Sequence, residues 1–179
     1  MKYNDITLGK VEAIINMLGG MEGVQQLLSG NMELKVINHI IDCDKAPLIP
    51  YDSWKVEEHI KGGQFTWNPE KVKLFLSVNQ KDGKSIEGNK LRKELKDEPV
   101  MNANLLDYLL DHPHLIPEEW KVDEKGNTRY IFFWGTIYRS AGDRLCVRFL
   151  YFSGGRWKQD YCWLGYGFDG NHPACVSAK

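Results

Sequence analysis

Apolar side chains recur at helical spacing in two short runs within the first thirty residues. The first run comprises Val11, Ile14, Ile15 and Leu18, and the second comprises Val24, Leu27 and Leu28. Gly19-Gly20 separates the runs and Gly30 follows the second, and glycine commonly ends a helix at such positions in the left-handed conformation. The pattern therefore predicts a helical hairpin over residues 1–30, in which the helices lie between residues 7 and 30.

Residues 31–127 predict a mixed α+β region that begins with two strands. Residues 32–41 are apolar and β-branched enough for the first strand. Residues 72–78 predict the second, and the pair Asp82-Gly83 after it is typical of a tight turn.

Helices are expected in the second half of this region. Residues 89–96 predict a short charged helix, and Asn102 or Asn104 suits the N-cap of a longer one that Pro113 ends. The side chains expected on the buried stripe of the longer helix are Leu105, Leu106, Leu109 and Leu110.

The composition changes after residue 127. Thirteen of the 21 aromatic residues lie there, and three β-type runs appear over 129–139, 144–152 and 156–164. Glycines in the short connections between the runs suit tight hairpin turns. Residues 128–179 therefore predict a three-stranded antiparallel meander, packed with 31–127 as one domain, and the fold class is α+β.

The alternation of side chains in the meander suggests a binding surface. One face is expected to pack on the helices, while the other, which carries Arg148, Lys158 and Asp160 among aromatic residues, is expected to be partly exposed. Trp, Tyr and Arg are enriched at protein interfaces. The candidate binding residues are Trp134, Tyr138, Arg148, Trp157, Lys158 and Trp163. The simpler interpretation is that cross-strand aromatic pairs only hold the sheet together.

Charge and composition narrow the class of protein. The net charge is −1, but residues 128–179 hold seven basic against three acidic residues, which permits an acidic partner. No run approaches the roughly 18 apolar residues of a membrane helix, and residues 1–10 lack the pattern of a signal peptide. A cytoplasmic protein without a membrane segment is expected, and its four scattered cysteines are expected to be free thiols.

Five histidines raise the question of a metal site. His112 and His114 flank Pro113, and His172 lies near Cys175, so at most two ligands are close together in sequence. A transition-metal site needs three or four converging ligands. We therefore expect no metal or cofactor, and we expect His112 and His114 to cap the carbonyls at a helix end.

The segment 57–64 combines acidic side chains, an imidazole and two glycines. His59 with Glu57 or Glu58 could form a general base, but the segment matches no catalytic motif and lacks the second histidine of a zinc protease. It is predicted to be a surface loop that leads into a strand at Phe65.

Several stretches of the chain resemble a group of uncharacterised bacterial proteins, seen especially in uncultivated lineages. The matching stretches are residues 54–59, 62–65, 67–68, 71–74, 102–110, 115–120 and 132–139. Residues 18–24 and 27–30 resemble the opening of other uncharacterised proteins from the same lineages, as though one leader were joined to different bodies. The resemblance covers residues 48–179 and implies a bacterial origin but no fold, activity or ligand.

Three functions remain open. The first is a non-enzymatic module that presents its aromatic sheet to a protein partner. The second is a single-stranded nucleic-acid-binding protein, in which the bases stack on the sheet while Arg148, Arg156 and Lys158 contact phosphates. The third is a small hydrolase or transferase that uses His59.

Overall fold

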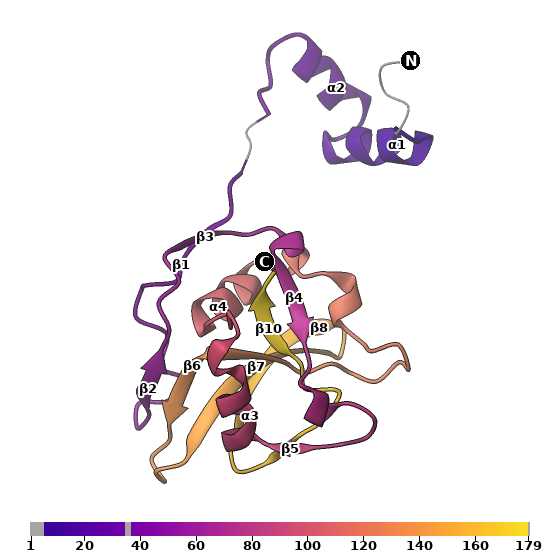
Figure 1. The fold of residues 1–179 in the computed structure, drawn as a ribbon. Helices are drawn as coiled ribbons and strands as arrows, with labels where there is room; N and C mark the ends of the chain where they lie inside the picture. The colour runs from indigo at the N-terminus through magenta and orange to yellow at the C-terminus, as the bar shows by residue number, and fades with distance from the viewer. Residues whose placement is uncertain (1–5, 35–36, 179) are drawn as a thin grey trace. The chain divides into compact units, whose positions relative to one another are not determined.

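The structure is a computed structural model that describes residues 6–34 and 37–178 (Figure 1). The chain forms two compact units, residues 1–38 and residues 39–179. The first unit contains two contacting helices, α1 (Leu8–Met17) and α2 (Met21–Leu28). The predicted helical hairpin is therefore confirmed.

The turn between α1 and α2 depends on its glycines. Gly19 and Gly20 adopt φ angles of +84° and +85°, which L side chains rarely adopt. Gly23 lies so close to α1 that a Cβ atom on it would sit 1.6 Å from the carbonyl oxygen of Leu18. The glycines therefore allow the chain to reverse and the two helices to touch.

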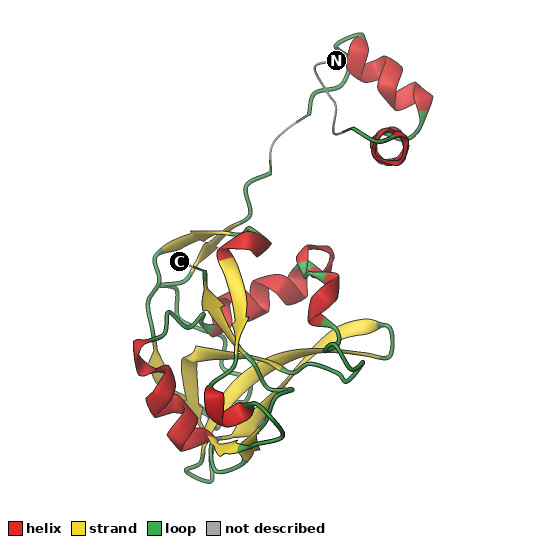
Figure 2. Ribbon diagram, turned by 45° about the vertical axis from the view of Figure 1, so that its right-hand side comes forward, coloured by secondary structure: helices red, strands yellow, loops and turns green. Residues whose placement is uncertain are grey.

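The C-terminal meander is the centre of the second unit. It consists of β6 (Ile131–Arg139), β7 (Leu145–Ser153) and β8 (Arg156–Trp163), as Figure 2 shows in yellow. Gly154 and Gly155, both with positive φ, form the two-residue turn that pairs Ser153 with Arg156. The predicted meander is confirmed.

Strands from elsewhere in the chain extend the meander to six strands. The order is β4 (Val72–Phe75), β10 (Ala174–Ser177), β6, β7, β8, and β2 (Lys55–His59) pairs with the second half of β6. β10 runs antiparallel to β4 and parallel to β6. The strand predicted over 72–78 ends earlier, because Ser77 caps a 3-10 turn that begins at Val78.

Two small strand pairs lie outside this sheet. One is β1 (Ile40–Asp42) with β3 (Gln64–Thr66), and the other is β5 (Ile86–Glu87) with β9 (Gly167–Phe168). The prediction of a strand over 32–41 is wrong in its extent: only Ile40 and Ile41 of the described residues are in a strand, and residues 35–36 lie outside the description. Apolar β-branched residues alone do not make a strand without a partner to pair with.

The helices of the second unit are α3 (Gly88–Glu94) and α4 (Ala103–Asp111). Asn102 caps α4 through a hydrogen bond from the Asn104 backbone N–H to its side chain. Leu105, Leu106 and Leu109 are each 0% exposed, so the predicted buried stripe is confirmed for these three, while Leu110 is half-buried. The 3-10 turns span Pro69–Lys71, Val78–Gln80, Leu95–Asp97, Pro113–Leu115 and Glu118–Trp120.

The sheet separates two hydrophobic cores. On one face, α4 packs on Ile131, Phe133 and Leu150. On the other, α3 and β9 pack on a core that includes Phe132, Trp134 and Val147. β6 is therefore covered on both faces. On β8, Lys158 is half-buried and Asp160 is exposed, but Arg148 of β7 is buried, so the prediction that these three side chains share one partly exposed face is wrong.

The register of the strands explains this error. Arg148 of β7 lies opposite Tyr161 of β8, so Arg148 shares a face with the odd-numbered residues of β8, while Lys158 and Asp160 lie on the other face. In β6, the register shifts between Phe132 and Ile137, so strict alternation does not hold along the strand. Among the described residues, no helix is long and apolar enough to cross a membrane.

Candidate functional site

Three of the six candidate binding residues are buried in the second unit. Trp134 is 3% exposed, Tyr138 is 0% exposed and Arg148 is 2% exposed. Trp134 packs in the core beneath α3, whereas the hydroxyl of Tyr138 donates to the carbonyl oxygen of Leu48 at 3.0 Å. These three side chains therefore do not form an exposed surface.

Arg148 is held by a buried ion pair. Its guanidinium donates two hydrogen bonds to the carboxylate of Asp107 on α4, one of them at 3.1 Å, and a third to the side-chain oxygen of Gln159 at 3.2 Å. Burial works to lower the pKa of Arg148, but the interactions with Asp107 and Tyr138 together outweigh it, and the net shift is upward. The ion pair joins α4 to the meander, so Arg148 is not available to a phosphate.

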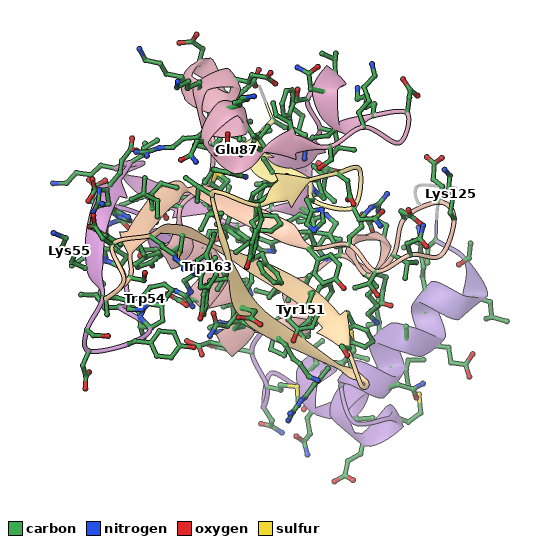
Figure 3. All side chains as sticks on the ribbon, turned by 90° about the horizontal axis from the view of Figure 1, so that it is seen from below. Trp54, Lys55, Glu87, Lys125, Tyr151 and Trp163 are labelled. Carbon is green, nitrogen blue, oxygen red and sulfur yellow. The ribbon has the colours of Figure 1, made fainter. Side chains whose placement is uncertain are left out.

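The other three candidates, Trp157, Lys158 and Trp163, are half-buried residues of β8. Trp157 packs edge-on against Phe152 and joins the core beneath α4. Lys158 lies on the opposite face of the strand. Trp163, which Figure 3 labels, is the last residue of β8. Its ring centre lies 5.3 Å from that of Tyr166.

His59 has a structural role rather than a place in a cleft. It lies in β2, so the prediction of a surface loop over 57–64 is wrong for residues 57–59, which belong to the strand that pairs with β6, and for Gln64, which begins β3. The Nε2 atom of His59 lies 3.1 Å from the carbonyl oxygen of Cys43, and Nδ1 lies 2.9 Å from Oγ1 of Thr136. Both ring nitrogens are thus engaged by the fold, with Nε2 donating to the carbonyl and Nδ1 accepting from the hydroxyl.

The neighbouring acidic residues are held in ion pairs. Glu57 receives two hydrogen bonds from Arg139, which lowers the pKa of the Glu57 carboxyl, and Glu58 pairs with Arg92 of α3. Neither carboxylate contacts His59 through a hydrogen bond among those of the described residues. His59 is thus paired with Thr136 and Cys43, and not with the carboxylate that the general-base hypothesis assigned to it.

Histidines gather at the C-terminal end of α4. The Nδ1 of His112 donates to the carbonyl oxygen of Tyr108 at 3.0 Å, which confirms the expected capping by this residue. The rings of His39 and His114 lie 5.8 Å and 6.2 Å from that of His112. In the part of the chain that the structure describes, no three metal-ligating side chains are arranged to hold an ion.

A basic cavity lies beside α3. This α3 cavity has a volume of about 410 Å³. Its wall includes the charged residues Glu58, Arg92, Lys93 and Lys96, with Trp134 beneath them. Lys93 and Lys96 form no ion pair with any described residue, so two positive charges face solvent without a protein partner.

A second cavity, the Trp163 cavity, lies at the end of β8. Its volume is about 700 Å³, and Trp163, Tyr166 and Arg144 lie along it. The rings of Trp163 and Tyr166 are 5.3 Å apart, and the Arg144 guanidinium lies 4.0 Å from the centre of the Trp163 ring. Tyr166 is 55% exposed, so this group of planar side chains is open to a ligand.

The two cavities are adjacent because Asn89, near the start of α3, lines both. Its backbone N–H and side chain both donate to the carbonyl oxygen of Leu164, which fixes α3 against the end of β8. At the preceding position, a Cβ on Gly88 would lie 2.5 Å from the Phe168 ring and 2.8 Å from the Leu164 carbonyl oxygen. Glycine therefore permits the close approach that brings the cavities together.

The joint lining is basic. The charged lining residues of the two cavities are Arg92, Lys93, Lys96, Arg139, Arg144, Glu58 and Asp143. Five are basic and two are acidic, a local charge of +3 in a protein whose net charge is −1. The combination of a positive rim and exposed planar rings suits an anionic ligand with aromatic groups.

Two unpaired hydrogen-bond donors belong to the same cavities. Within the described residues, the buried side-chain nitrogen and oxygen atoms that lack a partner are Nε1 of Trp134 and Nε1 of Trp163. A buried donor without an acceptor costs about 1–3 kcal/mol. Both nitrogens are shielded from solvent, so a ligand acceptor would reach them only if a neighbouring side chain moved.

Comparisons with protein-family models, curated proteins and solved structures gave no match for this chain. The case for the site therefore rests on its geometry. The sequence predicts Trp163 and Trp134 as binding residues, but it does not single out Arg92, Lys93, Lys96, Arg144 and Tyr166. The concentration of basic residues over 90–96 is the one signal in the sequence, but only the fold brings these residues next to residues 144 and 163–166.

Proposed function

We propose that this protein binds single-stranded nucleic acid across the α3 cavity and the Trp163 cavity. The observation that carries the proposal is the adjacency of the Trp163 and Tyr166 rings to Lys93 of α3 and Lys96 of the following 3-10 turn, which form no ion pair with a described residue. Proteins that bind single strands without sequence preference combine such stacking side chains with a basic groove that follows the backbone.

Each part of the surface has a role in this proposal. A base stacks on the exposed ring of Tyr166 or on the Trp163 ring after Arg144 moves aside to contact a phosphate. The adjacent phosphates of the strand lie along Lys93 and Lys96, where no ion pair with a described residue competes for the lysines. Arg92 contributes less, because Glu58 already neutralises it.

This location differs from the surface that the sequence predicts for a nucleic acid. Arg148 is buried and Lys158 lies on β8, outside the lining of either cavity. In this proposal Trp163 and Tyr166 stack on the bases, and Lys93, Lys96 and Arg144 contact the phosphates.

The binding test uses fluorescence anisotropy of labelled mixed-sequence single-stranded DNA and RNA at low salt. Tyr166→Ala should weaken binding, because loss of one base stack costs about 1–3 kcal/mol, or roughly 5- to 150-fold in affinity. The exposure of Tyr166 makes this variant unlike a core substitution, and thermal unfolding should stay unchanged.

Lys93→Ala with Lys96→Ala should also weaken binding, whereas Lys125→Ala removes the same kind of charge away from both cavities and serves as the control. Absence of binding to both kinds of strand at low salt would refute the proposal. An equal loss in the Lys125 control would show only nonspecific attraction and would also count against this site.

A further inference from the structure

The outer edge of β8 is an eight-residue strand edge that no described element covers by backbone pairing. β8 ends the sheet order and pairs with β7 alone. Exposed edges of this length are uncommon, because their free N–H and C=O groups offer a template to another strand. The outer edge of β8 is therefore a candidate site for pairing with a further strand.

The pairing with β7 decides which backbone groups point outward. The N–H of Leu164 donates to the Leu145 carbonyl oxygen, and in an antiparallel pair such contacts recur at every second residue. The backbone groups of Trp157, Gln159 and Tyr161 therefore face away from β7. The Tyr161 N–H is capped by the carboxylate of Asp160 at 2.8 Å, while the outward amides of Trp157 and Gln159 have no partner among the described backbone atoms.

Charge favours a second copy of the same strand as the occupant. When two β8 strands pair antiparallel about Gln159, Lys158 of each copy lies opposite Asp160 of the other, on one face of the joined sheet. Pairing about Asp160 would place two carboxylates opposite each other, and pairing about Lys158 would oppose two ammonium groups. Pairing about Tyr161 places neither charge opposite the other, so the register about Gln159 is the favoured one.

We propose that two copies of this chain associate as a two-fold dimer through β8, with Gln159 on the symmetry axis. Backbone hydrogen bonds join Gln159 to Gln159 of the second copy, and Trp157 to Tyr161 on either side of the axis. Asp160 exchanges its contact with the Tyr161 N–H for one with Lys158 of the second copy, which frees that N–H for the new ladder. The residues that pair across the axis, Trp157 to Tyr161, line neither cavity, so the dimer does not rest on the proposed function.

Sedimentation equilibrium of the full chain over micromolar to millimolar concentration tests the dimer. The wild type should shift from monomer to dimer. In the dimer of Lys158→Glu, the new glutamate of each copy lies opposite Asp160 of the other copy. The two repulsive pairs should raise the dimer dissociation constant at least about tenfold. Asp160→Lys should do the same through paired lysines. The double variant restores opposite charges with reversed sign and should regain most of the wild-type affinity.

Three further variants serve as controls. Gln159→Pro removes an outward N–H without breaking a backbone bond to β7, and it also removes the hydrogen bond that the Gln159 side chain accepts from Arg148. It should abolish the dimer, whereas Gln159→Ala, which loses the same side-chain hydrogen bond but keeps the N–H, should still dimerise. Lys125→Glu changes the net charge as Lys158→Glu does, but away from β8, and should leave the dimer intact.

Several results would overturn the proposal. A protein that stays monomeric up to millimolar concentration excludes the dimer. A dimer that survives Gln159→Pro uses another surface, such as the exposed apolar side chains of α1, where Leu8 and Met17 are 84% and 87% exposed. A double variant as weak as either single variant would exclude the register about Gln159.

Discussion

Removing either partner of the Arg148–Asp107 ion pair should destabilise the protein, but the two removals should differ. Arg148 is 2% exposed, whereas the side chain of Asp107 is 28% exposed. Asp107→Asn leaves a buried guanidinium without its counter-charge, and such a loss typically costs 3–5 kcal/mol. We expect the lower end, about 3 kcal/mol, because Gln159 still accepts one hydrogen bond from Arg148.

After the substitution Arg148→Met, each polar group that contacted the arginine can form a hydrogen bond elsewhere. Asp107 and Gln159 reach water, and the Tyr138 hydroxyl keeps its hydrogen bond to Leu48, while the methionine fills the space of the arginine stem. The expected cost is about 1 kcal/mol. Both losses of unfolding free energy can be measured by urea unfolding monitored by circular dichroism. They are calculated from the shift of the unfolding midpoint, provided that the dependence of the free energy on urea concentration is the same in each variant. A larger loss for Arg148→Met than for Asp107→Asn would refute the reasoning that burial of the arginine decides the cost.

Two further predictions concern the core and the thiols. Leu106→Ala or Leu109→Ala should each lower the free energy of unfolding by about 2–5 kcal/mol in the same urea assay, because both side chains are 0% exposed; a loss under about 0.5 kcal/mol would mean that α4 packs differently. All four cysteines are free, and burial raises the pKa of Cys43 and Cys162 from 9.0 to about 11. The thiolate is the reactive form, so at pH 8 these two thiols in the folded protein should react with iodoacetamide roughly 100-fold more slowly than in urea, by mass spectrometry. The pKa of each thiol is higher in the folded than in the unfolded protein, so the stability that the buried thiols contribute should be present below about pH 9 and should decline as the pH rises through about 11. A protein that gains stability over this pH range would contradict the assignment.

The sequence predicts those elements whose signals are local. The meander follows from β-type runs and the Gly154-Gly155 turn, and α4 follows from its cap and its leucine stripe. These features depend on neighbouring residues, so no knowledge of distant contacts is needed to find them.

Elements that depend on distant pairing were missed. β2 is a polar strand that is recognisable only by its pairing with β6, and β10 is a short strand between β4 and β6. The face on which Arg148 lies depends on the register of β7 with β8, which the turn sets and simple alternation within one strand does not reveal.

The candidate site was only partly predictable for the same reason. Trp163 is conspicuous in sequence, but its companions come from α3, from the start of β7 and from the turn after β8. Adjacency of the two cavities depends on Asn89 meeting the Leu164 carbonyl, a contact across 75 residues. Spacing along the chain carries no signal for such a contact.

The salt dependence of oligonucleotide affinity tests the proposed function most directly. Three basic side chains, Lys93, Lys96 and Arg144, are free of ion pairs with described residues and are expected to contact phosphates. Each phosphate contact on a single strand contributes a slope of about −0.7 in log affinity against log salt, so the wild type should show a slope of about −2. Lys93→Ala with Lys96→Ala should reduce it to about −0.7, while Tyr166→Ala should lower affinity at every salt concentration and leave the slope at about −2. A slope near zero in the wild type, or a slope that the double lysine variant leaves unchanged, would contradict binding at this surface.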